Sequence, residues 1–250
     1  MPDDSERILK ELLGDEVEEL AFQQIDEIPE VLPILPVRGA VLFPGALMPV
    51  LVAKDSSLRL VRTVLDGDGL LVVTAVKDEA PPEPGVDDLY HHGTVARVLK
   101  ALPLPNGKLN VITQGLGRAV LHDLQGPEPY FLGRPELRPD RSEEQDVELE
   151  ALTVSVRRLL RRILKLAPGV PEELQALAES IGEPGGFADI IAANLSLEVA
   201  EKQKVLESET GSERLRLVLN LLTRHLQVLE LPQRLVVEDE ARRPHLIDAR

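Results

Sequence analysis

Two short glycine-containing stretches have residue types that could hold a nucleotide. Gly107 precedes Lys108, and Gly115 and Gly117 follow a few residues later. A phosphate-binding loop needs a longer glycine-rich turn that ends in Gly-Lys-Ser or Gly-Lys-Thr, because its backbone amides must surround the phosphates. Here Lys108 is followed by Leu109. The sequence therefore predicts a turn at Gly107-Lys108 and no nucleotide cofactor.

The sequence also lacks the patterns of nucleophilic and metal-dependent hydrolases. No serine lies in Gly-x-Ser-x-Gly, no His-Glu-x-x-His occurs, and the chain has no cysteine. His91 and His92 are adjacent, so in a strand they point to opposite faces and cannot share one ion. His122, His225 and His245 are scattered, and we interpret His225 as a hydrogen-bonded interior or interface residue. We expect no catalytic residue, no metal site and no cofactor.

Two groups of residues in the sequence could bind a partner without performing chemistry on it. Phe43, Leu47 and Met48 could line an apolar groove that holds unfolded segments, because aromatic and methionine side chains adapt to varied partners. The alternative is ordinary core packing. A basic helical stripe beside Val154 is the second candidate, and it could receive an acidic partner, including the acidic N-terminal segment of this chain. Its alternative is a solvated helix face. The stripe contains Arg157, Arg158, Arg161, Arg162 and Lys165.

Charge and composition limit the classes of partner. The net charge is −15, and residues 1–30 hold eleven acidic residues against Arg7 and Lys10, a net of −9. An acidic surface repels phosphate backbones, so a nucleic-acid partner is disfavoured. No apolar run approaches the roughly 20 residues that cross a bilayer, and the acidic start has no signal-like segment. We expect a cytoplasmic protein without a membrane partner.

The elements that would position these residues begin with an acidic amphipathic helix over residues 6–20. From Val31 to Leu137 the pattern is mainly β. Two extended segments should flank a turn at Gly39, with strand ends at Pro33 and Pro49, because proline is tolerated at strand starts and edges.

The rest of this β region contains one helix and further strands. Ser56 or Ser57 is the expected helix cap, Gly67 the expected end, and Leu70 to Val76 a buried strand. Asn106-Gly107 predicts a hairpin, since both residues tolerate positive φ. About six short strands should form a small closed or strongly coiled sheet.

Residues 139–230 predict a helical bundle of four or five helices. A helix should run from a capping box at Ser142 to about residue 167, and another over 171–182. Ser196 and Ser212 are expected caps, and Leu231-Pro232 should stop the last helix. That helix should bury Leu215, Val218, Leu222 and Leu229. The predicted class is α+β: an acidic leader (1–30), a barrel-like β lobe (31–138), the helical lobe (139–230) and a divergent tail (231–250).

Three ordered stretches resemble the N-terminal, substrate-binding domain of Lon-family ATP-dependent proteases. They are Leu32-Pro33-Ile34-Leu35-Pro36-Val37-Arg38 with Phe43-Pro44 and Met48-Pro49-Val50, then residues 88–96, then 104–118. A weaker helical resemblance reaches about residue 229. The resemblance implies a domain that binds substrates and helps to assemble the ring, without chemistry of its own. It also implies that the ATPase and serine–lysine protease modules of that family lie outside this sequence.

These observations predict a protein that binds unfolded or damaged polypeptides, as an adaptor or modulator of ATP-dependent proteolysis with a full-length Lon-type protease as partner. One alternative is a self-association domain that forms homo-oligomers and recognises no substrate. Another is a truncated remnant of an ATP-dependent serine protease. RNA binding, which a small coiled β lobe would also suit, is disfavoured by the charge.

Overall fold

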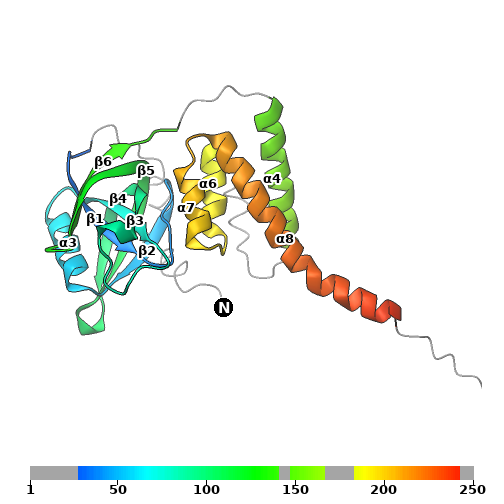
Figure 1. Ribbon diagram of the computed structural model, residues 1–250, viewed down its shortest axis with the longest axis horizontal. Coiled ribbons are helices and arrows are strands. Elements are labelled where there is room, and N and C mark those ends of the chain that lie inside the picture. The colour runs from blue at the N-terminus through cyan, green and yellow to red at the C-terminus, as the bar shows by residue number, and fades with distance from the viewer. Residues whose placement is uncertain (1–27, 141–146, 167–182, 243–250) are drawn as a thin grey trace, which may run out of the picture.

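The computed structural model describes residues 28–140, 147–166 and 183–242, with side chains up to residue 230. These residues form a β-barrel lobe and a helical lobe that lie side by side (Figure 1). The predicted leader helix, the capping box at Ser142 and the predicted helix over 171–182 lie outside the described residues. Within the described part of the chain, no helix is both long and apolar enough to span a bilayer.

Six strands build the first lobe, in the order β2-β5-β4-β3-β1-β6. The second half of β5 also pairs with β6, so β1, β3, β4, β5 and β6 close into a barrel, and β2 remains at an edge beside the first half of β5. The predicted closed sheet is confirmed. The strands are β1 (Leu32–Val37), β2 (Leu47–Val52), β3 (Leu70–Val76), β4 (Leu89–Pro103), β5 (Leu109–Gln125) and β6 (Phe131–Leu137).

The barrel owes its shape to one buried strand and two long ones. Every residue of β3 is buried, as its unbroken apolar sequence predicts. The β4–β5 hairpin turns at Asn106 and Gly107, whose φ angles of 68° and 74° confirm the expected left-handed pair. β4 and β5 are longer than predicted, because register shifts near Val95 and Val98 let them coil around the barrel without breaking.

Pro33, Pro36 and Pro49 lie inside β1 and β2, so the prediction that strands end at Pro33 and Pro49 is wrong. β1 pairs with β6 over residues 32–34 and with β3 over residues 34–37. Pro33 therefore pairs only with β6, and Pro36 pairs only with β3. The nitrogen of each proline, which lacks a hydrogen, can face away from the strand with which that residue pairs. Pro49 lies in β2, whose outer side pairs with no described strand. A proline is compatible with a strand wherever its missing donor is not needed.

Helix α3 (Asp55–Asp66) covers one side of the barrel. It buries Leu60, Val61 and Val64 against β1 and β3 residues of the barrel core. The expectation that Ser56 or Ser57 caps this helix is wrong, because the N-cap is Lys54 and both serines lie inside the helix. The C-cap is Gly67, as predicted. Short 3₁₀ turns cover Val86–Asp88 and Pro105–Gly107.

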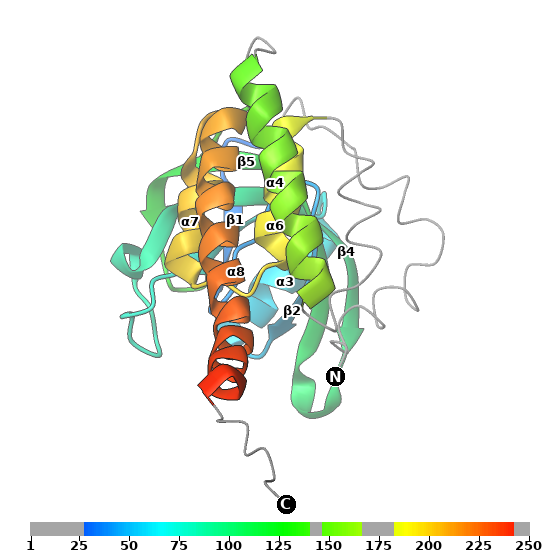
Figure 2. The ribbon, with the colours of Figure 1, turned by 90° about the vertical axis from the view of Figure 1, so that its right-hand side faces the viewer.

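Four described helices form the second lobe: α4 (Val147–Leu166), α6 (Pro184–Asn194), α7 (Val199–Glu207) and α8 (Gly211–Arg242). Figure 2 shows α4 and α8 side by side, with α6 and α7 between them and the barrel. The predicted serine caps are wrong. Glu198 is the N-cap of α7, and the Thr210 hydroxyl accepts from the Glu213 amide at the start of α8.

The prediction that helix α8 stops at Leu231-Pro232 is wrong. The backbone of α8 stays helical to Arg242 (Figure 1). A proline removes one helical hydrogen bond and kinks or weakens a helix, but it does not by itself end one. The buried seam of α8 is as predicted, with Leu215, Val218 and Leu222 fully buried and Leu229 partly buried.

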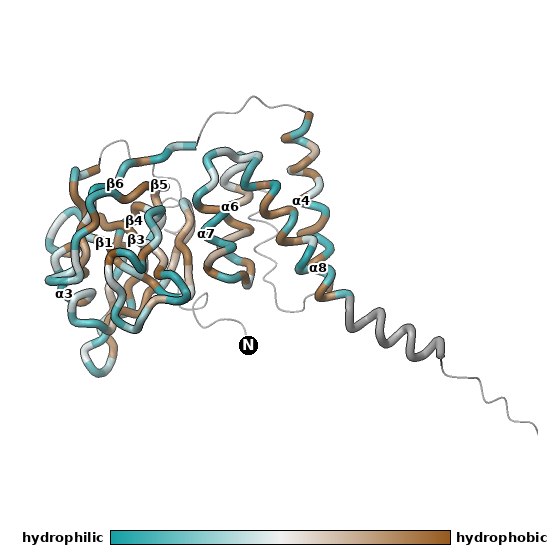
Figure 3. The backbone as a smooth tube through the Cα atoms, viewed as in Figure 1, coloured by the Kyte–Doolittle hydropathy of each residue, from teal (hydrophilic) through white to brown (hydrophobic). Residues whose placement is uncertain are grey.

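The two lobes share an apolar core. Val41, Phe43 and Ala75 of the barrel lobe belong to the same buried cluster as Phe187 of α6 and Val205 of α7. Figure 3 shows the apolar stretches concentrated on the strands and on the helix segments of the compact body. The barrel lobe and the helices are therefore packed on one another rather than joined only by the chain.

Candidate functional site

Strand β2 offers an open apolar edge. It pairs antiparallel with β5 from Leu47 opposite Gln114 to Val52 opposite Leu109, and its other side meets no described strand. The six residues are Leu-Met-Pro-Val-Leu-Val, without a charge. Leu51 has 61% of its surface exposed. Most sheets protect such edges with charges or short strands, so an uncharged open edge is a site for pairing with another chain.

The turn before β2 fixes this strand on the barrel. The Gly45 amide donates to the Gly115 carbonyl at 2.9 Å, and the Gly115 amide donates to the Ala46 carbonyl at 2.9 Å. Thr94 Oγ1 donates to the Leu42 carbonyl at 2.6 Å. A side chain at position 115 would collide with the Phe43 carbonyl, so glycine there allows the turn to lie directly on β5.

Backbone direction along β2 follows from this contact. The Ala46 carbonyl points to β5, and N–H and C=O groups two residues apart in a strand point the same way. Residues 48, 50 and 52 therefore direct their hydrogen bonds to β5, whereas residues 47, 49 and 51 direct theirs outward. The missing donor of Pro49 then faces away from β5, and the amides of Leu47 and Leu51 are outward donors.

The three apolar residues singled out in the sequence do not share one surface. Phe43 is fully buried in the core between the lobes, so it offers no surface to a partner and the core-packing alternative holds for it. Met48 packs against the barrel core. Leu47 is half-buried and, by strand alternation, lies on the opposite face of β2 from Met48, together with Leu51. Sequence reasoning missed Leu51, which ranks among the most exposed large apolar residues of the lobe.

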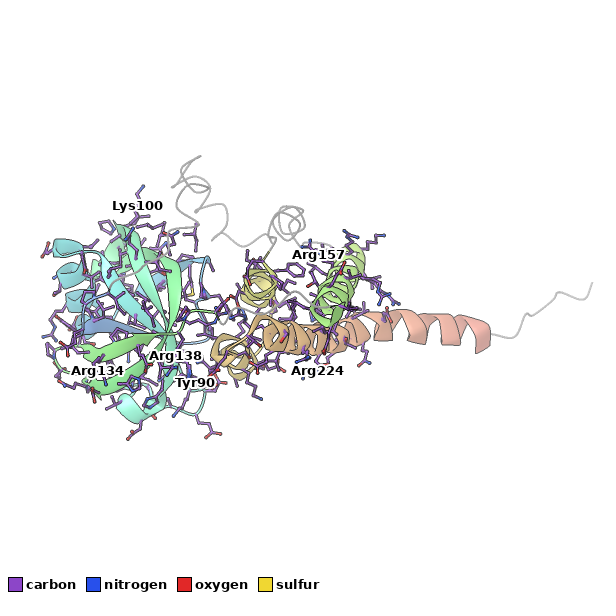
Figure 4. The ribbon with its side chains drawn as sticks, turned by 90° about the horizontal axis from the view of Figure 1, so that it is seen from above. Tyr90, Lys100, Arg134, Arg138, Arg157 and Arg224 are labelled. Carbon is purple, nitrogen blue, oxygen red and sulfur yellow. The ribbon has the colours of Figure 1, made fainter. Side chains whose placement is uncertain are left out.

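The basic stripe on α4 is divided between two roles. The Arg157 guanidinium lies 4.6 Å from the centre of the Phe187 ring, and Arg162 pairs with Glu230 of α8. Figure 4 shows Arg157 on α4 and Arg224 on the neighbouring α8. Arg158, Arg161 and Lys165 point outward and are exposed. The sequence placed all five on one helix correctly; Arg157 contacts the Phe187 ring, and the exposed Arg162 forms an ion pair with Glu230.

A shallow groove of about 450 Å³ lies where the barrel meets α7. Its lining includes the apolar Val120 and Leu137 and the charged Arg138 and Glu207. Figure 4 places Arg138 and Tyr90 on the part of the barrel nearest the helices. The Gln203 amide donates to the His92 carbonyl at 3.0 Å, so this groove is bordered by hydrogen bonds between the lobes.

Beneath this groove, four charged side chains join the lobes. Arg118 of β5 donates to Asp140 at 3.2 Å, to Asp189 of α6, and to the Leu206 carbonyl of α7 at 3.2 Å. Arg214 of α8 donates to both oxygens of Asp140. Arg214 is 0% exposed, and Asp189 is nearly so. Sequence reasoning missed this cluster, because its members lie far apart in the chain and carry no local pattern.

The environment shifts the pKa values of these groups. Burial raises the pKa of the Asp189 carboxyl, and this effect exceeds the opposing charges of Arg118 and Arg214. At Asp140, burial also acts upward, but the hydrogen bonds from Arg214 and the charge of Arg118 leave its pKa below the ordinary value. Burial lowers the pKa of Lys202, whose ammonium donates to the Ala193 carbonyl at 3.0 Å.

The lowered pKa of Asp140 predicts how the stability of the fold depends on pH. A carboxyl with a lowered folded pKa stabilises the fold above its unfolded pKa of about 3.9, and this contribution is lost as pH falls through the folded pKa. We expect Asp140→Asn to be less stable than wild type at pH 7, with a difference that shrinks below about pH 4. Urea unfolding across the pH range measures this. The exposed Asp123, paired with Arg134, supplies Asp123→Asn as the control with a small difference throughout. A gap that widens in acid would contradict the assignment.

Among the described residues, no three histidine or acidic side chains gather as metal ligands would. His91 lies 3.3 Å from the Leu121 carbonyl, His92 lies 3.8 Å from Glu207, and His122 contacts Glu136 at 2.9 Å. Each therefore has a separate partner, and His91 and His92 diverge as strand alternation predicts. His225 is half-buried on α8. The outer side of β2 pairs with no described strand, and the charged cluster of Arg118, Asp140, Asp189 and Arg214 ties the two lobes together.

Comparisons with known proteins agree with this architecture. The family model of the ATP-dependent protease La (LON) substrate-binding domain matches residues 31–224. The N-terminal domain of Mycobacterium avium complex Lon protease superposes with a TM-score of 0.64 at 22% identity, over 78% of this chain and 99% of that one. The Lon N-terminal domain protein from Xanthomonas campestris gives a TM-score of 0.55 at 19% identity, over 76% and 97%. These two likenesses establish the fold.

Sequence relatives establish the family. Lon protease of Anaeromyxobacter dehalogenans is 38% identical over 210 residues, which are 84% of this chain and 25% of that protein. Lon protease 2 of Myxococcus xanthus is 36% identical over 84% of this chain and 25% of its own length. This chain belongs to the Lon protease substrate-binding domain family, as its three motifs predict. It spans about a quarter of the length of these relatives.

Proposed function

We propose that this chain binds unfolded or damaged polypeptides, and that the outer edge of β2 is where it holds them. The observation that carries the proposal is this uncharged, outward-facing edge in a member of a substrate-binding domain family. An extended segment can add as a further strand, with main-chain hydrogen bonds giving affinity and apolar side chains giving preference. A folded protein has few extended segments to offer. The site therefore selects unfolded chains.

The chemistry of β2 suits a client of varied sequence. Main-chain donors and acceptors at residues 47 and 51 are the same for any client, so they impose no sequence. Leu47 and Leu51 lie on one face, where they favour apolar client residues. The nearby hairpin carries Leu104, which is also partly exposed. Pro49 interrupts the row of outward donors, so binding is weak and reversible rather than aggregating.

The test compares one client in two states. A disulfide-containing protein is used in its native form and in a permanently unfolded form made by reduction and alkylation. We expect the unfolded form to bind at least about tenfold more tightly, a difference of about 1.4 kcal/mol. Equal affinity for both forms, or binding of neither, would overturn the proposed function.

Leu51 provides a prediction for the site itself. Leu51→Lys places a charge where an apolar client residue would lie, so we expect about tenfold weaker binding of the unfolded client. Leu65→Lys on α3 is the matched control, because Leu65 is 46% exposed and lies outside β2. Fluorescence anisotropy of a labelled unfolded client measures both. A loss of the same size in both variants would place the binding surface elsewhere.

The partner in proteolysis is part of the proposal. We infer that polypeptides held here are passed to the ATPase and protease modules of a Lon protease, either on the same polypeptide or on a separate one. Self-association is a second candidate, favoured by the projection of α8 beyond the helical lobe to Arg242 (Figure 1). Light scattering after size exclusion, with and without a full-length Lon protease, separates a monomer, a homo-oligomer and a mixed complex.

A further inference from the structure

Helix α4 presents an outward face that the proposed client site does not use. Its side chains follow alternating steps of four and three residues, which place them along one side of a helix. All of them are exposed, and the opposite side buries Val156, Leu160 and Ile163. Figure 2 shows α4 on the side of the helical lobe away from the barrel. This outward face consists of Val147, Ala151, Val154, Arg158, Arg161 and Lys165, with Glu150 at its border.

The outward face is apolar at its centre and carries opposite charges on the two sides of that centre. Val154 has 57% of its surface exposed, and Val147 has 83%. The exposed Glu150 comes four residues before Val154, and the exposed Arg158 comes four residues after it. Apolar side chains that stay exposed side by side on a helix are typical of a contact surface for another protein.

The two charges beside Val154 differ from other charges of the same helix. Glu148 and Arg162 each form an ion pair with a side chain of α8. Among the described residues, neither Glu150 nor Arg158 has an ion-pair partner. Because they lie at equal distances from Val154 and have opposite sign, this face is complementary to a reversed copy of itself.

We propose that two copies of this chain associate through α4, with the two helices antiparallel and a two-fold axis beside Val154. Such an interface uses the same surface on both copies, as a two-fold dimer requires. Each Glu150 then lies opposite Arg158 of the other copy, and the two Val154 side chains are in contact. The small side chain of Ala151 lets the two helices approach closely.

The extent of the contact predicts its strength. The seven residues of this face extend over about 27 Å of helix, which is less contact than the roughly 1,600 Å² of a standard interface needs. We therefore expect a weak dimer that depends on protein concentration and on salt. The proposal rests on the self-association considered above, for which it gives a surface, and it leaves β2 open to a client.

Opposite charge reversals test the two ion pairs in the full chain. Glu150→Lys makes both charged positions of the face positive, and Arg158→Glu makes both negative. Sedimentation equilibrium should show about tenfold weaker dimerisation for each variant alone. An equimolar mixture of the two should recover the wild-type affinity, because every facing pair in the mixed dimer is again oppositely charged. A change in the folding of either variant does not produce this recovery.

A single thiol tests the position of the axis. The chain has no cysteine, so Val154→Cys carries one thiol per copy. We expect mild oxidation to cross-link Val154→Cys into a dimer, whereas Leu65→Cys, at a 46% exposed position of α3, stays monomeric. A wild-type dimer with neither the cross-link nor the recovery in the mixture would place the interface elsewhere and overturn the α4 contact. A wild type that stays monomeric up to about 1 mM would overturn self-association as well.

Discussion

Replacing Arg214 by methionine is expected to lower the free energy of unfolding by about 3–5 kcal/mol. Arg214 is fully buried and donates to both oxygens of Asp140, and its Nε lies 3.7 Å from Asp189. Methionine keeps much of the side-chain volume but removes the charge. The carboxylates of the buried Asp189 and the half-buried Asp140 then keep Arg118 as the remaining cation of the cluster. An uncompensated buried charge costs far more than a broken surface pair.

Arg216→Met is the matched control, two residues along the same helix. Arg216 is half exposed and pairs with the exposed Glu148, so its loss should cost less than about 1 kcal/mol. Urea unfolding of both variants gives the comparison. Similar, small losses for Arg214→Met and Arg216→Met would mean that the cluster does not hold the lobes together.

Gly115→Ala is expected to lower the free energy of unfolding by about 2–3 kcal/mol, the cost of forcing extra atoms into a packed site. The added Cβ would lie 3.0 Å from the Phe43 carbonyl carbon and even closer to its oxygen, and 3.1 Å from Thr94 Cγ2. The backbone turn must therefore move. Since this turn leads directly into β2, we also expect weaker binding of an unfolded client.

Gly117→Ala tests whether the effect comes from that contact. Gly117 lies in the same strand, and an added Cβ there would be 3.6 Å from Leu137 Cδ2, an ordinary contact. Thermal unfolding should show little change for Gly117→Ala and a clear decrease for Gly115→Ala. Equal decreases would show that strand β5 requires glycine at both positions for another reason.

The parts of the fold that were predictable have strong local signals. The apolar run of β3 and the Asn106-Gly107 turn specify their own structures, and both are as expected. Proline positions were misjudged, because the effect of a proline depends on which neighbour a strand pairs with at that residue. Pro33, Pro49 and Pro232 all lie where the backbone tolerates a missing donor or a lost bond, and a single sequence does not report pairing.

The candidate site was partly predictable. The motif around Leu47 and Met48 includes the strand at which we propose that clients bind, but residue type alone did not say which side chains face outward. Phe43 is a large apolar residue in that motif and is buried against the helical lobe, whereas Leu51 is exposed. The cluster of Arg118, Asp140, Asp189 and Arg214 could not be found, because its members come together only through tertiary packing.

Unfolded clients are proposed to pair with the outer edge of β2. Amide hydrogen exchange with and without a saturating unfolded client measures this directly, residue by residue. We expect slower exchange at the amides of Leu47 and Leu51 when the client is bound, and unchanged exchange at the inward amides of Met48 and Val50. Client binding that leaves the exchange of Leu47 and Leu51 unchanged would contradict it.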